Sequence, residues 1–165
     1  MTAIQAEVKV AFTLNGAAIE WTVEPGEILL DALRRHGWFG VKRGCDSGDC
    51  GTCTVLLDGQ PVNSCQVFAA QMGGCELLTI EGVAQGDVLD PLQEAFLDHG
   101  GVQCGYCTPG MILIAKWLLN ENPDPSELEV REALRGNLCR CTGYKKIVEA
   151  VLAVAASRRK EAVRK

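Results

Sequence analysis

The sequence has no long apolar run, no basic patch outside its last residues, and only two histidines. No apolar stretch approaches the ~18 residues that a membrane span needs, which argues against a membrane-spanning protein. Basic residues gather only in the tail RRKEAVRK, and the net charge of the chain is −5. This distribution argues against nucleic acid as a partner. We expect the tail to end a helix, where cations lie near the negative end of the helix dipole.

A targeting signal is also missing from the N-terminus. The segment MTAIQAEVKV has neither a basic region followed by an apolar one nor a pair of arginines. We therefore expect a cytoplasmic protein, whose thiols are kept reduced. Nine cysteines among 165 residues are more than packing needs, and a reducing compartment disfavours structural disulfides. Metal binding is thus the expected role of the cysteines.

The first half of the chain is predicted to be an α+β unit. Its expected elements are a hairpin over residues 7–23, a helix over 28–37, a second hairpin over 54–65 and a strand over 76–82. Asn-Gly and Asp-Gly turns between alternating apolar residues indicate the two hairpins. Strands grouped around one helix are typical of the α+β class, so we assign a first domain to residues 1–82.

The second half is predicted to be helical. Asp90 followed by proline indicates the start of one helix, and Ser126 with Glu129 forms a capping box at the start of another. Further helices are expected from about residues 108 and 144. Four helices of this length predict a small bundle over residues 83–165, joined to the first half by GVAQGD.

Eight of the nine cysteines fall into two groups, one in each half. The first group has the spacing C-x4-C-x2-C-x11-C and consists of Cys45, Cys50, Cys53 and Cys65. Its first three members have the plant-type [2Fe–2S] spacing, which takes a fourth cysteine from further along the chain. Glycines in GCDSGDCGTC remove side chains that would obstruct a cluster, and backbone N–H groups can then donate to sulfur. Cys65, on the return strand of the second hairpin, is the candidate for the remaining ligand.

The second group consists of two pairs in the helical half: Cys104, Cys107, Cys139 and Cys141. One pair lies in VQCGYCTPG before a helix, and the other lies in NLCRCTGY between two helices. An antiparallel bundle would bring both loops to one end, where the positive ends of helices favour thiolates.

Three other roles fit this cysteine pattern less well. Zinc often takes C-x2-C pairs, but C-x-C and a glycine-rich C-x4-C-x2-C are less typical of zinc sites. A catalytic cysteine lacks a visible partner, since His36 and His99 both fall at predicted helix ends. A disulfide scaffold would leave one cysteine over. Cys75, the ninth, is interpreted as a small, partly buried residue.

Three stretches together resemble a known family. GCDSGDCGTC with Cys65, QCGYCTPGM and NLCRCTGY are similar to the small iron–sulfur subunit of molybdenum hydroxylases, the family of xanthine dehydrogenase, aldehyde oxidase and CO dehydrogenase. The resemblance extends from about residue 7 to residue 155. It implies a β-grasp, ferredoxin-like N-terminal domain and a C-terminal four-helix bundle, each with one [2Fe–2S] cluster. The approach HGWFGVKRGC is slightly compact for the family, and Cys75 is an addition.

The resemblance also implies a function and partners. The chain would relay single electrons from a molybdopterin centre in a large subunit, through the two clusters, to FAD in a medium subunit, without turning over substrate alone. Gln103 and Cys141 would lie beside the pterin, in a heterotrimer or a dimer of heterotrimers. The substrate would be a purine, an N-heterocycle or an aldehyde. A stand-alone two-cluster ferredoxin and a zinc-bound interaction module are the alternatives, although a free shuttle is expected to carry one cluster domain and a marked acidic surface.

Overall fold

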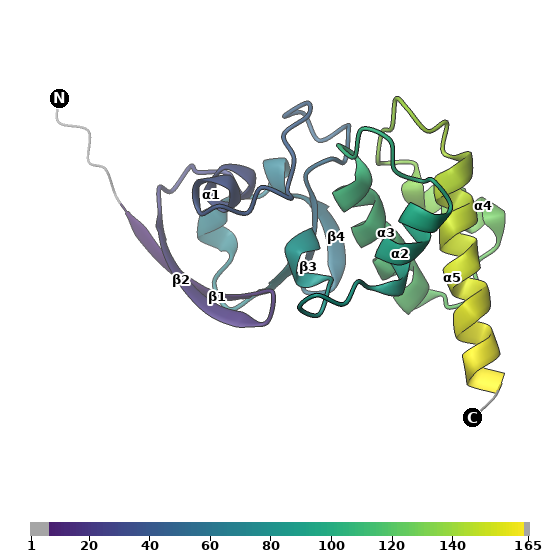
Figure 1. Ribbon diagram of the computed structural model, residues 1–165. Helices are drawn as coiled ribbons and strands as arrows, with labels where there is room; N and C mark the ends of the chain where they lie inside the picture. The colour runs from purple at the N-terminus through teal and green to yellow at the C-terminus, as the bar shows by residue number, and fades with distance from the viewer. Residues whose placement is uncertain (1–6, 164–165) are drawn as a thin grey trace.

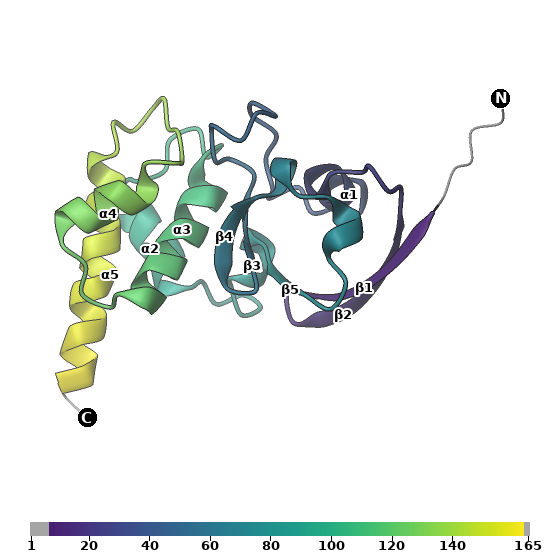
Figure 2. The same cartoon turned by 180° about the vertical axis from the view of Figure 1, so that it is seen from behind.

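The computed structural model describes residues 7–163, which divide into a sheet half and a helical half (Figures 1 and 2). One mixed sheet of five strands and the helix α1 (Leu29–Arg35) make up the sheet half. The other four α-helices of this part of the chain follow in the helical half. The α+β class predicted from the sequence is therefore confirmed.

The sheet has the strand order β2-β1-β5-β3-β4. Its strands are β1 (Val8–Leu14), β2 (Ala17–Val23), β3 (Thr54–Leu57), β4 (Gln60–Asn63) and β5 (Glu76–Leu78). Both predicted hairpins are present, and β5 lies between β1, to which it is parallel, and β3, to which it is antiparallel. The last strand is shorter than predicted. After Leu78 the chain leaves the sheet, because Thr79 N donates to the side chain of Asn15 at 2.8 Å, and a short 3-10 helix (Ile80–Gly82) follows.

The core of the sheet half forms where α1 packs against the sheet. Fully buried side chains include Leu14, Leu29, Leu30, Leu33 and Leu77. Each such leucine contributes about 1.5–3 kcal/mol relative to an exposed one. Trp21 closes one side of this core, meeting Phe12 edge-to-face at 4.9 Å and stacking on His36 at 4.1 Å. His36 thus has a packing role at the end of α1.

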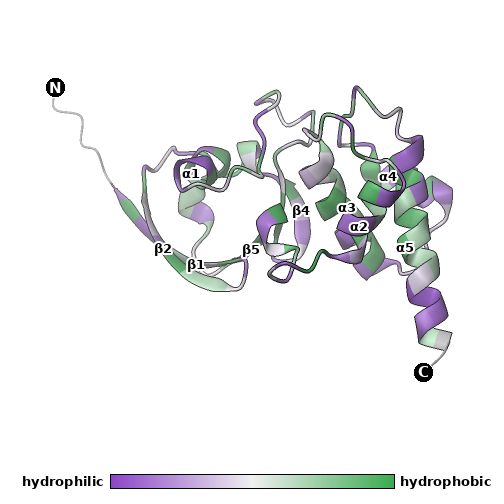
Figure 3. Ribbon diagram, viewed as in Figure 1, coloured by the Kyte–Doolittle hydropathy of each residue, from purple (hydrophilic) through white to green (hydrophobic). Residues whose placement is uncertain are grey.

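The helical half consists of α2 (Pro91–Asp98), α3 (Thr108–Glu121), α4 (Glu127–Leu134) and α5 (Lys145–Val163). The helix start predicted at Asp90 and the capping box predicted at Ser126 with Glu129 are both present, and Asp90 also forms a capping box with Gln93. Apolar residues are concentrated in α3 and in the middle of α5, whereas the later turns of α5 are hydrophilic (Figure 3). The basic tail therefore continues a helix as far as Val163, and its last two residues lie outside the described range.

The two halves are packed against each other through β3 and α3. Leu56 of β3 is 5% exposed and belongs to the buried apolar cluster of the helical half. Val55, the preceding residue of β3, belongs instead to a second cluster, which contains α1 and residues of β1, β2 and β5. Within residues 7–163, no helix combines the length and apolarity that crossing a bilayer would require.

Asp90 offers a test of this architecture. Its side chain caps α2 by accepting from Leu92 N at 2.9 Å, and it also accepts from Lys116 Nζ of α3 at 2.7 Å. Asp90→Ala removes both contacts and should cost about 1 kcal/mol, which lowers the thermal midpoint by roughly 2–4 °C. Asp90→Asn should lose less, since asparagine caps helices as well as aspartate does. Circular dichroism melting of the two variants would contradict this account if asparagine were the more damaging residue.

Candidate metal centres

The loop that begins at Lys42 folds around the thiol of Cys45. The backbone N–H groups of Ser47 and Cys50 donate to Cys45 Sγ, each at 3.4 Å. Hydrogen bonds from the Ser47 side chain and from these N–H groups stabilise the thiolate, so the pKa of Cys45 falls to about 6. Gly44 leaves room for the neighbouring thiol, because a Cβ there would lie 2.6 Å from Cys50 Sγ. The N–H···S contacts that the glycine-rich sequence predicts are present in this loop.

Cys53 and Cys65 form the buried side of the first group. Their exposed fractions are 2% and 6%, and the Cys65 thiol influences the pKa of Cys53. Burial raises the pKa of Cys53 to about 11. Cys65 lies in a short 3-10 helix (Ser64–Gln66) just after β4, not on the return strand itself. Gln66 Nε2 donates to Cys65 Sγ at 3.4 Å, which gives this sulfur a polar partner.

The second group brings the two loops of the helical half together as predicted. Cys104 Sγ and Cys141 Sγ lie 3.6 Å apart, and their contact raises the pKa of Cys141. Cys107 precedes the first residue of α3, and burial raises its pKa to about 12. Burial also opposes ionisation of Cys139, but hydrogen bonds from the side chain and backbone of Thr142 lower its pKa overall.

The thiols of both groups influence one another two by two. Cys104 Sγ and Cys141 Sγ are in contact, and the pKa of Cys45 responds to Cys50, that of Cys53 to Cys65, and that of Cys107 most strongly to Cys139 among the other thiols. Two thiolates on one tetrahedral metal at about 2.3 Å lie roughly 3.8 Å apart, close to the 3.6 Å of the Cys104–Cys141 pair. Among residues 7–163, His, Cys, Asp and Glu side chains form no group of three or more placed to hold a single metal ion. Pairs of thiols suit a centre of two metal atoms, each of which takes two of the four thiolates.

The cysteine loops of the two groups lie side by side along one edge of the molecule, at the top of Figures 1 and 2. Leu138 N, next to Cys139, donates to the carbonyl oxygen of Cys50 at 2.9 Å. Tyr106 Oη, between the cysteines of the other loop, donates to the carbonyl oxygen of Arg43. The first loop is therefore bonded to both loops of the second group, a contact that the sequence did not predict.

Two residues around the second group were also missed from the sequence. Tyr144 Oη accepts from Cys139 N at 2.9 Å and donates to the carbonyl oxygen of Asn137 at 3.1 Å. Tyr144 adopts a positive φ of 67°, which a non-glycine residue rarely takes. Asn137 is buried, with 2% of its surface exposed. Nothing within NLCRCTGY indicates that Tyr144 bonds to Cys139 and Asn137 or that Asn137 is buried, because both depend on how the loop folds.

Gln103 and Cys75 lie apart from these contacts. The side chain of Gln103 is exposed, directly before Cys104. Cys75 packs beside the core of the sheet half, with its Sγ 3.9 Å from the carbonyl oxygens of Gln71 and Gly73. This environment suits the small, partly buried residue that Cys75 was interpreted to be.

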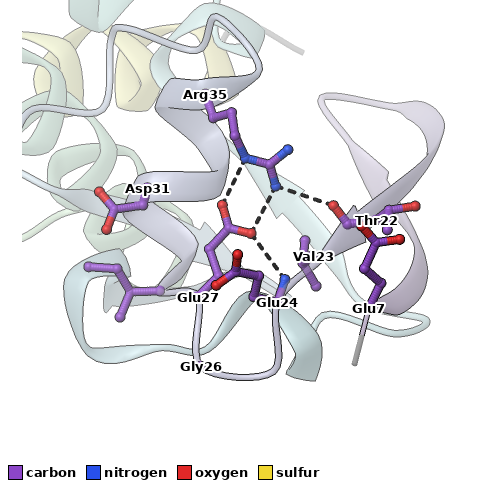
Figure 4. Close-up of a pocket in the computed structure, with 9 residues that line it drawn as sticks. Glu7, Thr22, Val23, Glu24, Gly26, Glu27, Asp31 and Arg35 are labelled. Atoms are coloured by element: carbon purple, nitrogen blue, oxygen red, sulfur yellow. Dashed lines mark hydrogen bonds and ion pairs between the residues drawn. The ribbon is translucent and has the colours of Figure 1, made fainter. Parts of the chain in front are cut away.

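A hollow of about 570 Å³ also lies between β2 and α1 (Figure 4). Carboxylates line much of it, and Arg35 neutralises one of them by donating to Glu27 at 2.8 Å. Arg35 also donates to the carbonyl oxygen of Thr22 at 3.2 Å. Its lining contains no cysteine, so this hollow is separate from the metal-binding residues.

Two family models match the chain, one in each half. Residues 12–73 match a 2Fe-2S iron-sulfur cluster binding domain, and residues 79–152 match a [2Fe-2S] binding domain. The nicotinate dehydrogenase small FeS subunit of Eubacterium barkeri is 50% identical over 146 residues, which are 88% of this chain and 93% of that protein. The xanthine dehydrogenase iron-sulfur-binding subunit of Escherichia coli O157:H7 is 44% identical over 148 residues, 88% of this chain and 92% of that protein.

A solved structure extends the likeness to the fold. A chain of quinoline 2-oxidoreductase from Pseudomonas putida 86 superposes with a TM-score of 0.90 and 47% identity, covering 93% of this chain and 97% of that one. The chain belongs to the family of small iron–sulfur subunits of molybdenum hydroxylases. This iron–sulfur subunit is thus part of an oxidoreductase and binds [2Fe–2S]. Neither of the two family models describes a zinc site, so they do not support the zinc alternative. All nine cysteines of the iron–sulfur subunit are free of disulfides.

Gly44 provides a test of the first loop. Gly44→Ala should displace the Cys50 thiol, because the added Cβ would lie 2.6 Å from both Cys50 Sγ and Thr52 Oγ1. We expect less iron per chain and weaker visible absorbance after purification. Gly73→Ala is the matched control, since a Cβ at Gly73 meets nothing within 4 Å. Equal iron content in the two variants would show that the loop tolerates the extra methyl group.

Proposed function

We propose that this subunit relays electrons one at a time between a molybdopterin centre in a large partner subunit and FAD in a medium partner subunit. The eight cysteines of the two groups would hold two [2Fe–2S] clusters, and each cluster supplies one-electron redox chemistry when bound. The chain itself would supply position, hydrogen bonds to sulfur and exclusion of water. Family membership supports the electron-transfer role.

The assignment of ligands rests on the pairing of thiols. We assign Cys45 with Cys50 to one iron and Cys53 with Cys65 to the other iron of the first cluster, because the pKa of Cys45 responds to Cys50 and the pKa of Cys53 responds to Cys65. By the same criterion, Cys104 with Cys141 and Cys107 with Cys139 would each hold one iron of the second cluster. The N–H donors to Cys45 support this fit, since such bonds stabilise negative charge on sulfur.

One observation carries the relay proposal: the hydrogen bond of 2.9 Å from Leu138 N to the carbonyl oxygen of Cys50. The acceptor, Cys50, is a proposed ligand of the first cluster. The donor, Leu138, directly precedes Cys139, a proposed ligand of the second cluster. Electron transfer between two centres requires them to be held close together, and this bond ties their loops directly. A protein that merely stored two clusters would have no need of such a junction.

The outer face of the second group would meet the molybdopterin. Cys104, Cys141 and Gln103 are all exposed at this end of the helical half. We propose that Gln103 and Cys141 contact the pterin there, and that the first cluster, whose Cys45 is also exposed, lies toward FAD. The names of relatives that act on nicotinate, xanthine and quinoline favour an N-heterocycle as substrate of the whole complex.

The arrangement of domains is part of the same proposal. We assign a β-grasp domain to residues 1–82 and a four-helix bundle to residues 83–165, supported by the two buried apolar clusters. We further propose a cytoplasmic location and assembly as a heterotrimer or a dimer of heterotrimers. Purification of the chain without larger partners would favour a stand-alone two-cluster ferredoxin instead.

Alanine variants of two buried thiols test whether the clusters are independent. Cys53→Ala and Cys107→Ala should each halve the iron content and remove a different electron paramagnetic resonance signal, since each thiol belongs to one group. Cys75→Ala is the matched control and should retain both signals. Loss of both signals in either folded variant would refute two separate sites.

The same variants, in the complete complex, test the order of transfer. In the Cys53→Ala complex, substrate should still reduce the second cluster, but FAD should stay oxidised. In the Cys107→Ala complex, substrate should reduce neither the first cluster nor FAD, because the first step of the relay is missing. Rapid mixing with substrate, followed by absorbance and paramagnetic resonance, distinguishes the two. Normal FAD reduction in the Cys107→Ala complex would reverse the proposed order.

A further inference from the structure

A buried amide joins the two cysteine loops. Asn137 Nδ2 donates to the carbonyl oxygen of Gly51 at 2.9 Å and to Thr54 Oγ1 at 3.3 Å. The next residue, Leu138, donates its N–H to the carbonyl oxygen of Cys50, also at 2.9 Å. Two consecutive residues of one loop therefore bond two consecutive carbonyls of the other.

The contact is possible because side chains are missing around it. A Cβ on Gly51 would lie 2.3 Å from the carbonyl oxygen of Gly136 and 2.7 Å from the Asn137 side chain. A Cβ on Gly110, in the first turn of α3, would lie 2.6 Å from both Asn137 Nδ2 and the Gly51 carbonyl oxygen. Alanine is the better residue in most helices, so glycine at position 110 is explained by this packing and not by the helix.

The position requires a hydrogen-bond donor. Thr54 Oγ1 donates to the Gly51 carbonyl oxygen at 2.7 Å, so its oxygen is left to accept from Asn137. Asn137 Nδ2 thus faces two acceptors, and an aspartate of the same shape would place an oxygen against them. Such a carboxylate would lose the bond to the Gly51 carbonyl oxygen and could be met there only by the Thr54 hydroxyl, so its burial is unfavourable.

Asn137 does not contact the proposed ligands through its side chain. Its amide bonds go to oxygen atoms of Gly51 and Thr54, and its carbonyl oxygen accepts from Tyr144 Oη at 3.1 Å. The residue is therefore placed to set the spacing between the loops without changing the surroundings of any thiol.

We propose that Asn137 is a positioning residue that fixes the separation of the two cysteine loops and thereby controls electron transfer between the two clusters. This proposal rests on the proposed relay function. It assigns to Asn137 a role in the step between clusters, whereas cluster binding depends on the cysteines and their N–H donors.

The principal test compares Asn137→Asp with Asn63→Asp in the complete complex. Asn63 is a matched control, because its Nδ2 donates to another glycine carbonyl of the same loop, Gly48 O, at 2.7 Å, but from within the sheet half. Its Oδ1 lies 3.5 Å from Thr54 Oγ1, and an aspartate keeps an acceptor at that position. Two measurements report the junction directly: the magnetic interaction between the two reduced clusters by paramagnetic resonance, and hydrogen exchange of the Leu138 amide.

For Asn137→Asp we expect loss of the magnetic splitting, faster exchange at Leu138 and slower electron transfer between the clusters. Iron content and the g-values of each separate cluster should stay unchanged. Asn63→Asp should keep the splitting and the protection of Leu138. Loss of a cluster in folded Asn137→Asp protein would overturn the proposal, since it would make Asn137 a residue that holds a cluster.

Gly110→Ala tests the same contact from α3 without introducing a charge. The added methyl group must displace Asn137 Nδ2 or the Gly51 carbonyl oxygen, each 2.6 Å from it, so this variant should reproduce the loss of splitting. Gly136→Ala is its control, because a Cβ there meets nothing within 4 Å. Normal clusters with unchanged splitting in both Asn137→Asp and Gly110→Ala would refute only the role of Asn137. An unmodified complex that lacked one cluster, or showed no interaction between two, would instead refute the relay itself.

Discussion

The close approach of two backbones, at Gly51 and at Gly136, is the contact on which the geometry of the cysteine loops depends. Once the backbones meet without side chains between them, their buried polar groups need partners inside the protein. The amide of Asn137 and the N–H of Leu138 supply those partners to the carbonyls of Gly51 and Cys50. The junction is thus a polar contact between two apolar cores, and its geometry is more directional than apolar packing alone would give.

Burial differs among the thiols in a way that suits a relay with two ends. Cys53, Cys65 and Cys107 are buried, whereas Cys45, Cys104 and Cys141 are exposed. In the proposed relay, the exposed pair of the second group faces one partner, and the Cys107–Cys139 pair lies on the side joined to the first loop. Exposed thiols would bring each centre near a partner's cofactor, while buried thiols limit access of water to the metal.

Local features of the fold were predictable from the sequence, and contacts between distant segments were not. Asp90 and Ser126 begin helices through bonds that reach at most three residues along the chain, so a short motif suffices to find them. The spacing C-x4-C-x2-C is equally local, and it correctly indicated [2Fe–2S] binding. By contrast, the bond from Asn137 to Gly51 spans 86 positions. Gly110 taken by itself indicates only a residue of low helix propensity. The early end of β5 has the same origin, because the side chain of Asn15 reaches it from 64 positions away.

The relatives also separate what this chain specifies from what its partners specify. Proteins named for nicotinate, xanthine and quinoline share 44 to 50% of their residues with this chain over most of its length. Substrates as different as these would demand different contacts, yet one small chain remains similar across all three. The role that we propose for this chain, the passage of electrons, does not depend on the substrate, and it would require cysteine pairs at fixed spacing and a fixed junction between their loops. In the proposed complex, therefore, substrate selection belongs to the large subunit, and the iron–sulfur subunit constrains only how the resulting electrons leave.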